Sequence, residues 1–289
     1  MATKGEILNA KVWAVFEKAG FTTKPNSADP SEFTAPIGNG RPLDLHAEVA
    51  TLGIKIIGSN KSGGITGSWT AHMNDCEALR KTVGADKCLL VATDHELDAS
   101  DLAHATSIGL TVWTEENLAY YEALVESIGS YAKYEIIHSL GITTHEESDI
   151  HKVLAIKLNQ PMSSGLTEVY AFTISPERLL KTSVIYRKAQ GRADAYQRML
   201  TRSRLPKIAE FLERFDAILP TDIILHMDDS IAVQPINLAD IRDPSGKPIP
   251  FSNTTNYLPV ALDIPMKYAS MEIIDGQHRL YGFVKAQQA

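Results

Sequence analysis

The sequence predicts an α/β protein with two domains. In the first half of the chain, helical patterns and short apolar segments follow in the order helix, strands, helix, strand, helix, strand, helix, which is typical of a layered α/β domain. The 289 residues are enough for two domains of ordinary size. Residues 141–151 are polar, and their histidine and acidic residues lack the spacing of a metal motif, so they indicate a linker. We therefore expect domains at 1–142 and 153–289, joined by a linker at 143–152.

The first half begins with an amphipathic helix at residues 5–19. Apolar residues recur at helical spacing from Leu8 to Phe16, and Gly20 is placed to end the helix. The elements expected after it are a loop at 22–40, strands at 42–49 and 54–59, a helix at 69–83, a strand at 88–92, a helix at 99–108, a strand at 110–113, and a helix from Glu115 to about Leu140 with a break near Gly129.

The second half indicates a small mixed α/β domain. Strands at 153–158 and 168–174 flank a turn at 161–165, and Pro206 suits the first turn of a helix. The remaining elements expected are a helical turn at 176–180, helices at 192–204 and from 206 to 219, and strands at 223–226, 231–233 and 257–264.

Composition indicates a globular protein without a membrane partner. The hydrophobic share is 44% and the charged share 22%. No apolar run approaches the roughly 20 residues of a membrane span, and the N-terminus lacks the apolar core of a signal peptide. Cys76 and Cys88, the two cysteines, make neither a disulfide scaffold nor a zinc site. We expect a cytoplasmic protein with reduced thiols.

The charge is unevenly distributed. The net charge of −7 argues against indiscriminate binding of nucleic acid. Between Glu177 and Lys207, however, nine basic residues are opposed only by Glu177 and Asp194, which gives this segment +7 and the remainder −14. A local basic segment on an acidic protein can still bind a polyanion such as DNA.

Residues 271–283 are expected to form a strand, a glycine turn and the start of a helix. Asp275 lies near the expected N-cap, and Gly276 allows a sharp turn. His278 and Arg279 add donors to the unpaired N–H groups of a first helical turn, which is a suitable arrangement for a phosphate. The alternative is a common strand–helix junction with a solvated His-Arg pair.

The sequence Asp-Gly-Gln-His-Arg at 275–279 resembles the signature of the DGQHR-domain proteins, which include the DndB-type regulators of DNA sulfur modification. That group is similar to the ParB and sulfiredoxin fold, in which Gly-x-x-Arg at a helix start binds nucleotide phosphates. The resemblance implies that ATP or another nucleoside triphosphate binds with Mg²⁺ at Asp275, Gly276, Gln277, His278 and Arg279. Gln277 stands where sulfiredoxins have their nucleophilic cysteine, and an amide cannot replace a thiolate.

The resemblance extends over residues 153–289. It includes Arg192 and Tyr196-Gln197-Arg198, and it implies a DNA-facing or nucleotide-facing role for Gln197 and Arg198, for which the alternative is an ordinary polar helix face. We also expect Arg192 and Arg202 of the basic segment to bind DNA. ParB-like domains usually continue beyond the motif helix, whereas this chain stops at Ala289. We therefore expect a truncated final layer, an uncovered edge strand and a homo-oligomer.

The first half resembles the Mrr-type restriction-endonuclease-like domains. In that family an acidic residue on one strand and acid-x-Lys on the next bind a divalent metal beside the scissile phosphate. Asp44 matches the first carboxylate and metal ligand, and Lys61 matches the lysine, but Ser59 occupies the second acidic position. Mg²⁺ needs one or two carboxylates, so we expect a degenerate catalytic site. Glu6 matches a further acidic position of some members, and Glu48 or Glu32 could replace the missing carboxylate.

These observations leave three functions open. The first is a nucleotide-binding, DNA-associated protein, with slow NTPase activity conceivable, in a bacterial DNA-modification or phage-defence system. The second is a Mg²⁺-dependent DNA endonuclease regulated by the DGQHR domain. The third is a non-enzymatic DNA-binding regulator that uses the basic segment. If Asp44 and Lys61 are only ordinary surface charges, the second function loses its support.

Overall fold

The structure, a computed structural model, shows a mixed α/β protein with several sheets. It describes residues 3–24, 43–63, 65, 67–94, 97–142, 149–162, 165–185, 203–214, 221–236, 245–247 and 257–288. Two compact units are present: the first comprises Met1–Thr144, Tyr186–Thr221 and His278–Ala289, and the second comprises His145–Ile185 and Asp222–Gln277. The long segment of the first unit thus ends inside the expected linker.

The first unit is built on a five-stranded mixed sheet. Its strands, in spatial order, are β1 (Thr22–Lys24), β2 (Leu45–Val49), β3 (Ile54–Ser62), β4 (Lys87–Thr93) and β5 (Thr111–Trp113). The pairs β1–β2 and β2–β3 are antiparallel, whereas β3–β4 and β4–β5 are parallel. The short helix η2 (Ala50–Leu52) and Gly53, at a φ of 64°, make the tight connection from β2 to β3.

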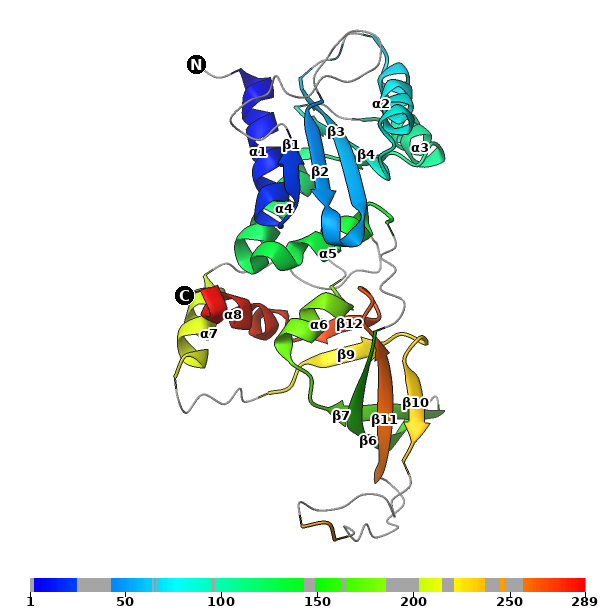
Figure 1. Ribbon diagram of the computed structural model, residues 1–289, viewed down its shortest axis with the longest axis vertical. Coiled ribbons are helices and arrows are strands. Elements are labelled where there is room, and N and C mark those ends of the chain that lie inside the picture. Colours follow the sequence, from blue (N-terminus) through cyan, green and yellow to red (C-terminus); the bar gives the residue numbers. More distant parts are fainter. Residues whose placement is uncertain are drawn as a thin grey trace. The chain divides into compact units, whose positions relative to one another are not determined.

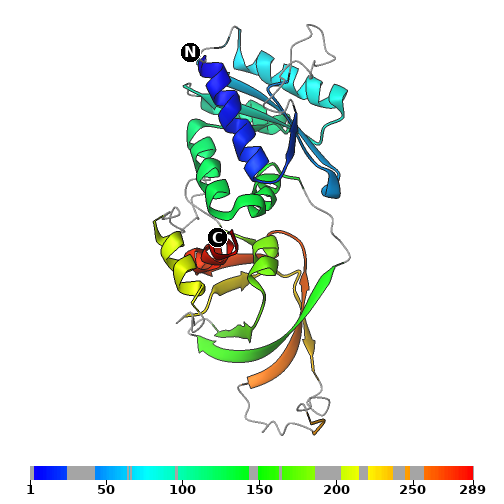
Figure 2. The ribbon, with the colours of Figure 1, turned by 60° about the vertical axis from the view of Figure 1, so that its left-hand side comes forward.

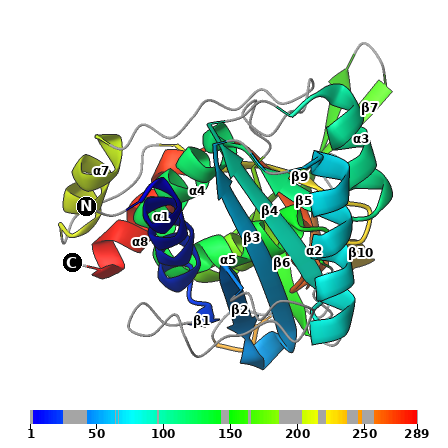
Figure 3. The same ribbon diagram turned by 90° about the horizontal axis from the view of Figure 1, so that it is seen from above.

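Helices cover both faces of this sheet. In Figure 1 and Figure 3, α1 (Lys4–Lys18) and α4 (Glu115–Ile128) lie on one face, and α2 (Trp69–Val83) and α3 (Ala99–Ser107) lie on the other. The helix after α4 breaks where the glycine predicts it: η3 (Gly129–Tyr131) precedes α5 (Ala132–Ser139). The expected order of helices and strands is therefore present.

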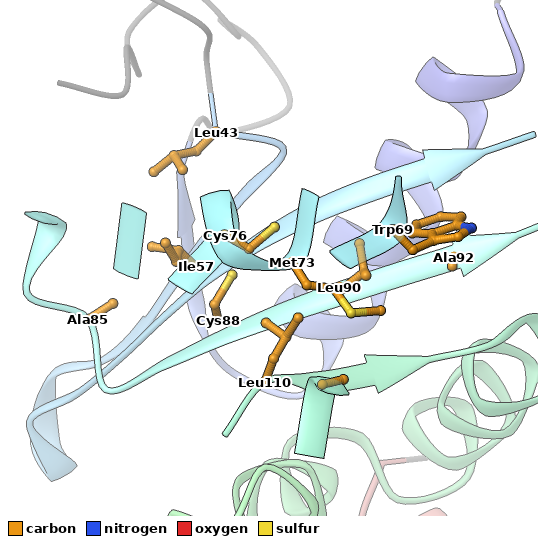
Figure 4. Packing of buried hydrophobic residues seen from close by; sticks show 11 residues of the cluster. Leu43, Ile57, Trp69, Met73, Cys76, Ala85, Cys88, Leu90, Ala92 and Leu110 are labelled. Carbon is orange, nitrogen blue, oxygen red and sulfur yellow. The ribbon is translucent and has the colours of Figure 1, made fainter. Parts of the chain in front are cut away.

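Each face of the sheet has its own apolar core. On the α1 and α4 face, Trp113 stacks on Tyr121 with ring centroids 4.1 Å apart and on Phe16 at 5.7 Å. On the α2 and α3 face, Ile57 and Leu90 pack with the cluster shown in Figure 4. These two cores hold β2 and β3, between which the candidate site lies, in the middle of the sheet.

The second unit contains a four-stranded antiparallel sheet. Its spatial order is β10 (Ala232–Pro235), β11 (Tyr257–Pro265), β6 (Ile150–Met162) and β7 (Gly165–Phe172). Figure 2 shows the long β6 and β11 curving side by side. Both strands extend beyond the ranges expected from sequence. The apolar pattern stops earlier, because the ends of the strands are polar.

A smaller sheet in the second unit carries the motif strand. It consists of β8 (Ser183–Val184), β12 (Met271–Asp275) and β9 (Ile224–Met227), with β12 in the centre. The helix α6 (Pro176–Thr182) leads directly into β8. Because β12 has a partner on each side, the motif strand is not an edge strand.

One face of the four-stranded sheet has exposed apolar side chains. Ile150, Leu154 and Ile156 alternate along β6 and are 53%, 74% and 49% exposed. Apolar surface of this kind often accompanies association. The expected homo-oligomer stays a prediction.

The helices α7 (Arg204–Leu212) and α8 (Gln277–Gln288) pack closely on each other. A Cβ atom placed on Gly282 of α8 would lie 2.3 Å from Cγ2 of Ile208. Only a residue without a side chain fits at this contact, which explains the glycine within a helix. Within the described residues, every helix is too short or too polar to cross a membrane.

Several expected boundaries were wrong. Thr22–Lys24 form a strand instead of loop, since pairing with β2 supplies the hydrogen bonds that their polar sequence does not predict. β2 begins at Leu45, not at residue 42. The strands expected around Asp228 belong to different sheets, with β9 on β12 and β10 on β11. The expected helix at 192–204 and residues 215–219 of the next helix lie almost wholly outside the described residues.

Candidate functional site

Asp44, Ser59 and Lys61 meet in the five-stranded sheet where β2 begins and β3 ends. Leu45 pairs with Gly58, which places Asp44 beside Ser59. Residues two apart on a strand face the same side, so Ser59 and Lys61 point together toward Asp44. The Ser59 hydroxyl donates to Asp44 Oδ2 at 3.3 Å, and Lys61 Nζ lies 3.7 Å from the same oxygen. The sequence pattern thus corresponds to a spatial cluster.

Hydrogen bonds from two further elements hold Asp44 in place. The backbone N–H of Asn60 donates to Asp44 Oδ2 at 2.8 Å, and Trp13 Nε1 donates to the Asp44 carbonyl oxygen at 2.6 Å. The Asn60 side chain turns to the opposite face of the sheet and donates to Asn9 Oδ1 at 2.9 Å. The carboxylate is therefore positioned by α1 and β3 before any ligand binds.

His72 extends the cluster and was not singled out from sequence. It lies in the first turns of α2, whose N-cap Ser68 accepts a hydrogen bond from the N–H of Ala71. His72 Nε2 is 3.3 Å from Ser59 Oγ and 3.9 Å from Cys76 Sγ. The spacing of His72 and Cys76 places both on one helix face, and this was the available signal.

The cluster fits Mg²⁺ poorly. Asp44 supplies the only carboxylate of this cluster, and its Oδ2 already interacts with Asn60, Ser59 and Lys61. No group of three or more histidine, cysteine or acidic side chains with metal-binding geometry occurs among the described residues. Mg²⁺ prefers carboxylate oxygens and water in near-octahedral geometry, so a single carboxylate with one oxygen already engaged is a weak ligand set.

The other acidic residues named from sequence are Glu48 and Glu32, as substitutes for the missing carboxylate, and Glu6, as a further acidic position. Glu48 interacts with His46 at 3.3 Å and with Lys55 at 3.8 Å, at the opposite end of β2. Glu6 accepts a hydrogen bond from the Thr3 N–H at 2.7 Å and closes the capping box of α1. The expectation for Glu48 was wrong, because Glu48 lies at the far end of β2 from Asp44. The expected role of Glu6 stays a prediction. Glu32 lies outside the described residues.

The second candidate site is the junction from β12 to α8. The predicted strand, glycine turn and helix are confirmed: β12 ends at Asp275, Gly276 has a φ of 105°, and α8 begins at Gln277. His278 and Arg279 therefore lie in the first turn of α8, where N–H groups and the helix dipole favour an anion. Gln277 is buried, at 5% exposure.

The expected DNA-binding residues Arg192, Gln197, Arg198 and Arg202 lie outside the described residues. Within the described part of the basic segment, Arg178 Nη1 is 2.9 Å from His151 Nε2, and Lys181 donates to Glu177 at 2.8 Å. Arg204 and Lys207 are exposed on α7.

Comparison of the chain with protein-family models, with curated proteins and with solved structures found no match in any of the three.

Proposed function

We propose that this chain is a DNA-associated, nucleotide-binding protein whose first unit is a restriction-endonuclease-like module with a degenerate active site. The observation that carries the proposal is the meeting of Asp44, Ser59 and Lys61 where β2 begins and β3 ends. A bacterial DNA-modification or phage-defence system is the setting that the sequence resemblances favour.

The first unit would bind a backbone phosphate through Lys61 and Ser59. The Lys61 ammonium supplies positive charge, and the Ser59 hydroxyl, which donates to Asp44 without ligand, would rotate to donate to the phosphate. Because Ser59 replaces a carboxylate, the cluster binds DNA without the ligand set that efficient metal-assisted cleavage needs. The overall charge of −7 limits the number of phosphate contacts.

The test compares two lysines on the same strand. Lys61→Ala should weaken binding of a DNA duplex in fluorescence anisotropy and reduce the salt slope by about 1, since one phosphate contact is lost. Lys55→Ala is the matched control, because Lys55 lies on the same face of β3 and also pairs with a carboxylate, Glu48 at 3.8 Å. Equal effects of the two changes would refute the phosphate site.

An active endonuclease is the second candidate, and the Asp44–Lys61 geometry is what favours it. It predicts DNA cleavage in Mg²⁺ or Mn²⁺ that Asp44→Ala abolishes, and cleavage that survives the change would discard this site. A degenerate site instead predicts that Ser59→Asp raises affinity for Mn²⁺, while Ser62→Asp, on the opposite face of β3, leaves it unchanged.

The β12–α8 junction would bind the triphosphate of a nucleotide. Support comes from the positive φ of Gly276 and the first-turn position of His278 and Arg279. Calorimetric titration with ATP, GTP and CTP, with and without Mg²⁺, should show binding that Arg279→Ala removes. Lys285→Ala, in the last turn of the same helix, is the control and should bind normally. Unchanged affinity in Arg279→Ala would exclude this junction.

A regulator that needs no nucleotide is the third candidate, favoured by the basic composition of residues 178–207. It predicts DNA affinity with a steep salt dependence that Arg198→Ala and Arg202→Ala reduce. A flat salt response would count against it.

A further inference from the structure

His72 brings a fourth side chain to the cluster of Asp44, Ser59 and Lys61. Its Nε2 lies 3.3 Å from Ser59 Oγ, while Ser59 itself donates to Asp44 Oδ2 at 3.3 Å. All four residues are half-buried, so a ligand can reach them from solvent. The contact therefore extends the proposed phosphate site from the sheet to the first turns of α2.

The hydrogen bonds of Ser59 decide the direction of its contact with His72. A hydroxyl has one proton to donate and two lone pairs with which to accept. Because the Ser59 proton goes to Asp44, the contact with His72 is a hydrogen bond only when Nε2 carries a hydrogen and donates to Ser59 Oγ. His72 thus presents an N–H donor where a phosphate oxygen would meet Ser59.

The charge of the cluster depends on His72. The Asp44 carboxylate and the Lys61 ammonium lie 3.7 Å apart and cancel each other, so with a neutral imidazole the cluster has no net charge to attract a phosphate. Protonation of His72 adds one positive charge, which matches the single negative charge of a phosphodiester. Histidine is the side chain whose charge ordinarily changes between about pH 5 and pH 8.

We propose that His72 is a phosphate-binding residue and that DNA binding at this cluster takes up one proton on its imidazole. The imidazolium donates from Nε2 to a phosphodiester oxygen, while Lys61 and Ser59 bind the same phosphate. This inference rests on the proposed phosphate site and names the protonation state in which that site binds. By linkage, DNA binds more tightly as pH falls, and bound DNA favours protonation of His72.

Charged and titratable side chains approach His72 from the sheet and from its own helix. On the sheet they are Asp44 and Lys61, which form an ion pair. On α2 they are Asp75 and Cys76, which lie three and four residues further along the helix. Asp75 is exposed, so water and salt screen its charge. Cys76 Sγ is buried, 3.9 Å from His72 Nε2, and is the other group that could take up the proton.

The first experiment measures the affinity for a DNA duplex by fluorescence anisotropy between about pH 8 and pH 5.5, where histidine changes its charge. Uptake of one proton predicts that wild-type affinity rises by up to about tenfold per pH unit. His72→Gln keeps an N–H donor without a titrating group, so it should match the wild type at the alkaline end and gain little as pH falls. A wild-type rise in His72→Gln would overturn the proposal and would place the proton on another group, such as Cys76.

A second histidine provides the matched control. His104 is exposed on α3 and lies 3.0 Å from Asn74 Oδ1, so it also titrates next to a polar partner. His104→Gln should keep the wild-type rise in affinity. Equal loss of the rise in His104→Gln and His72→Gln would show a general effect of net charge and would overturn the assignment to His72.

Calorimetry of the wild-type chain detects the proton without any variant. The heat of DNA binding at about pH 6.5 should change with the ionisation enthalpy of the buffer, because the buffer supplies the proton. The same heat in every buffer would overturn the proposal.

Lys61→Ala distinguishes failure of the phosphate site from failure of the role of His72. If Lys61→Ala binds DNA as Lys55→Ala does, the phosphate site itself is refuted, and this inference with it. If Lys61→Ala weakens binding while His72→Gln keeps the wild-type pH dependence, the site stands and only the role of His72 is refuted.

Discussion

The contact between Gly282 and Ile208 makes Gly282→Ala an informative change. The new methyl group would lie 2.3 Å from Ile208 Cγ2 and 3.0 Å from Ile208 Cβ. Both atoms belong to a β-branched side chain with a stiff χ1, so rotation of Ile208 cannot relieve the overlap cheaply. The helices α7 and α8 must therefore move apart, which loosens the support of the helix that carries Arg279.

Two effects of opposite sign decide how much Gly282→Ala changes the free energy of unfolding. Alanine stabilises a helix interior by about 1 kcal/mol relative to glycine, whereas overpacking a close contact costs about 1–3 kcal/mol. Because 2.3 Å is far inside van der Waals contact, we expect overpacking to exceed the helix preference and a net loss of about 1–2 kcal/mol. The assay is backbone hydrogen exchange of the α8 amides, together with urea unfolding.

Matched substitutions separate the effect of the contact with Ile208 from the helix preference of alanine over glycine. Gly5→Ala, within α1, meets nothing within 4 Å and should be neutral or stabilising by up to about 1 kcal/mol. Ile208→Ala should rescue Gly282→Ala, with a coupling energy of about 1 kcal/mol or more in a double-mutant cycle. Additive effects of the two changes, or a stabilised Gly282→Ala, would refute the reasoning.

Two further predictions concern local interactions. Thr3→Ala removes the capping box of α1 and should cost about 0.5–2 kcal/mol in urea unfolding, whereas Glu6→Gln should preserve both stability and DNA affinity, since glutamine also closes a capping box. A marked loss of DNA affinity in Glu6→Gln would return Glu6 to the candidate site. Hydrogen bonds from Arg80 lower the pKa of Glu77 from its ordinary value of 4.5. The ionised Glu77 therefore contributes fully to folding stability above pH 4.5, and this contribution is lost as pH falls through the lower pKa of the folded state. Stability measured against pH should therefore lose part of its acid dependence in Glu77→Gln, and an unchanged profile would contradict this.

Periodicity predicted the elements that bury one continuous apolar surface. The strand at 88–92 and the helix at 69–83 were found because their apolar residues make the core itself. β1 was missed because Thr22–Lys24 contain no apolar residue, and only pairing with β2 makes them a strand. The partner of β9 is a strand more than 40 residues away, and local sequence carries no information on such pairing.

In the candidate site too, features within one element were predictable, whereas contacts between elements were not. The spacing of Ser59 and Lys61 on one strand fixed their common face, so their meeting was predictable, as was the glycine turn before α8. The contact of His72 with Ser59 joins a helix to a strand. It depends on how far α2 is rotated about its axis over the sheet, and a spacing pattern within the helix does not set that rotation.

Ser59 has a second consequence besides leaving Asp44 as the only carboxylate of the cluster. A carboxylate in its place would lie beside Asp44, and two carboxylates that share a site repel each other unless a cation or a proton lies between them. The Ser59 hydroxyl removes that repulsion and donates to Asp44 at 3.3 Å, while the same oxygen lies 3.3 Å from His72. One residue therefore both leaves the cluster a poor set of Mg²⁺ ligands and stabilises it without metal. For that reason Ser59→Asp should lower the free energy of unfolding in the absence of Mn²⁺ and recover it when Mn²⁺ is added.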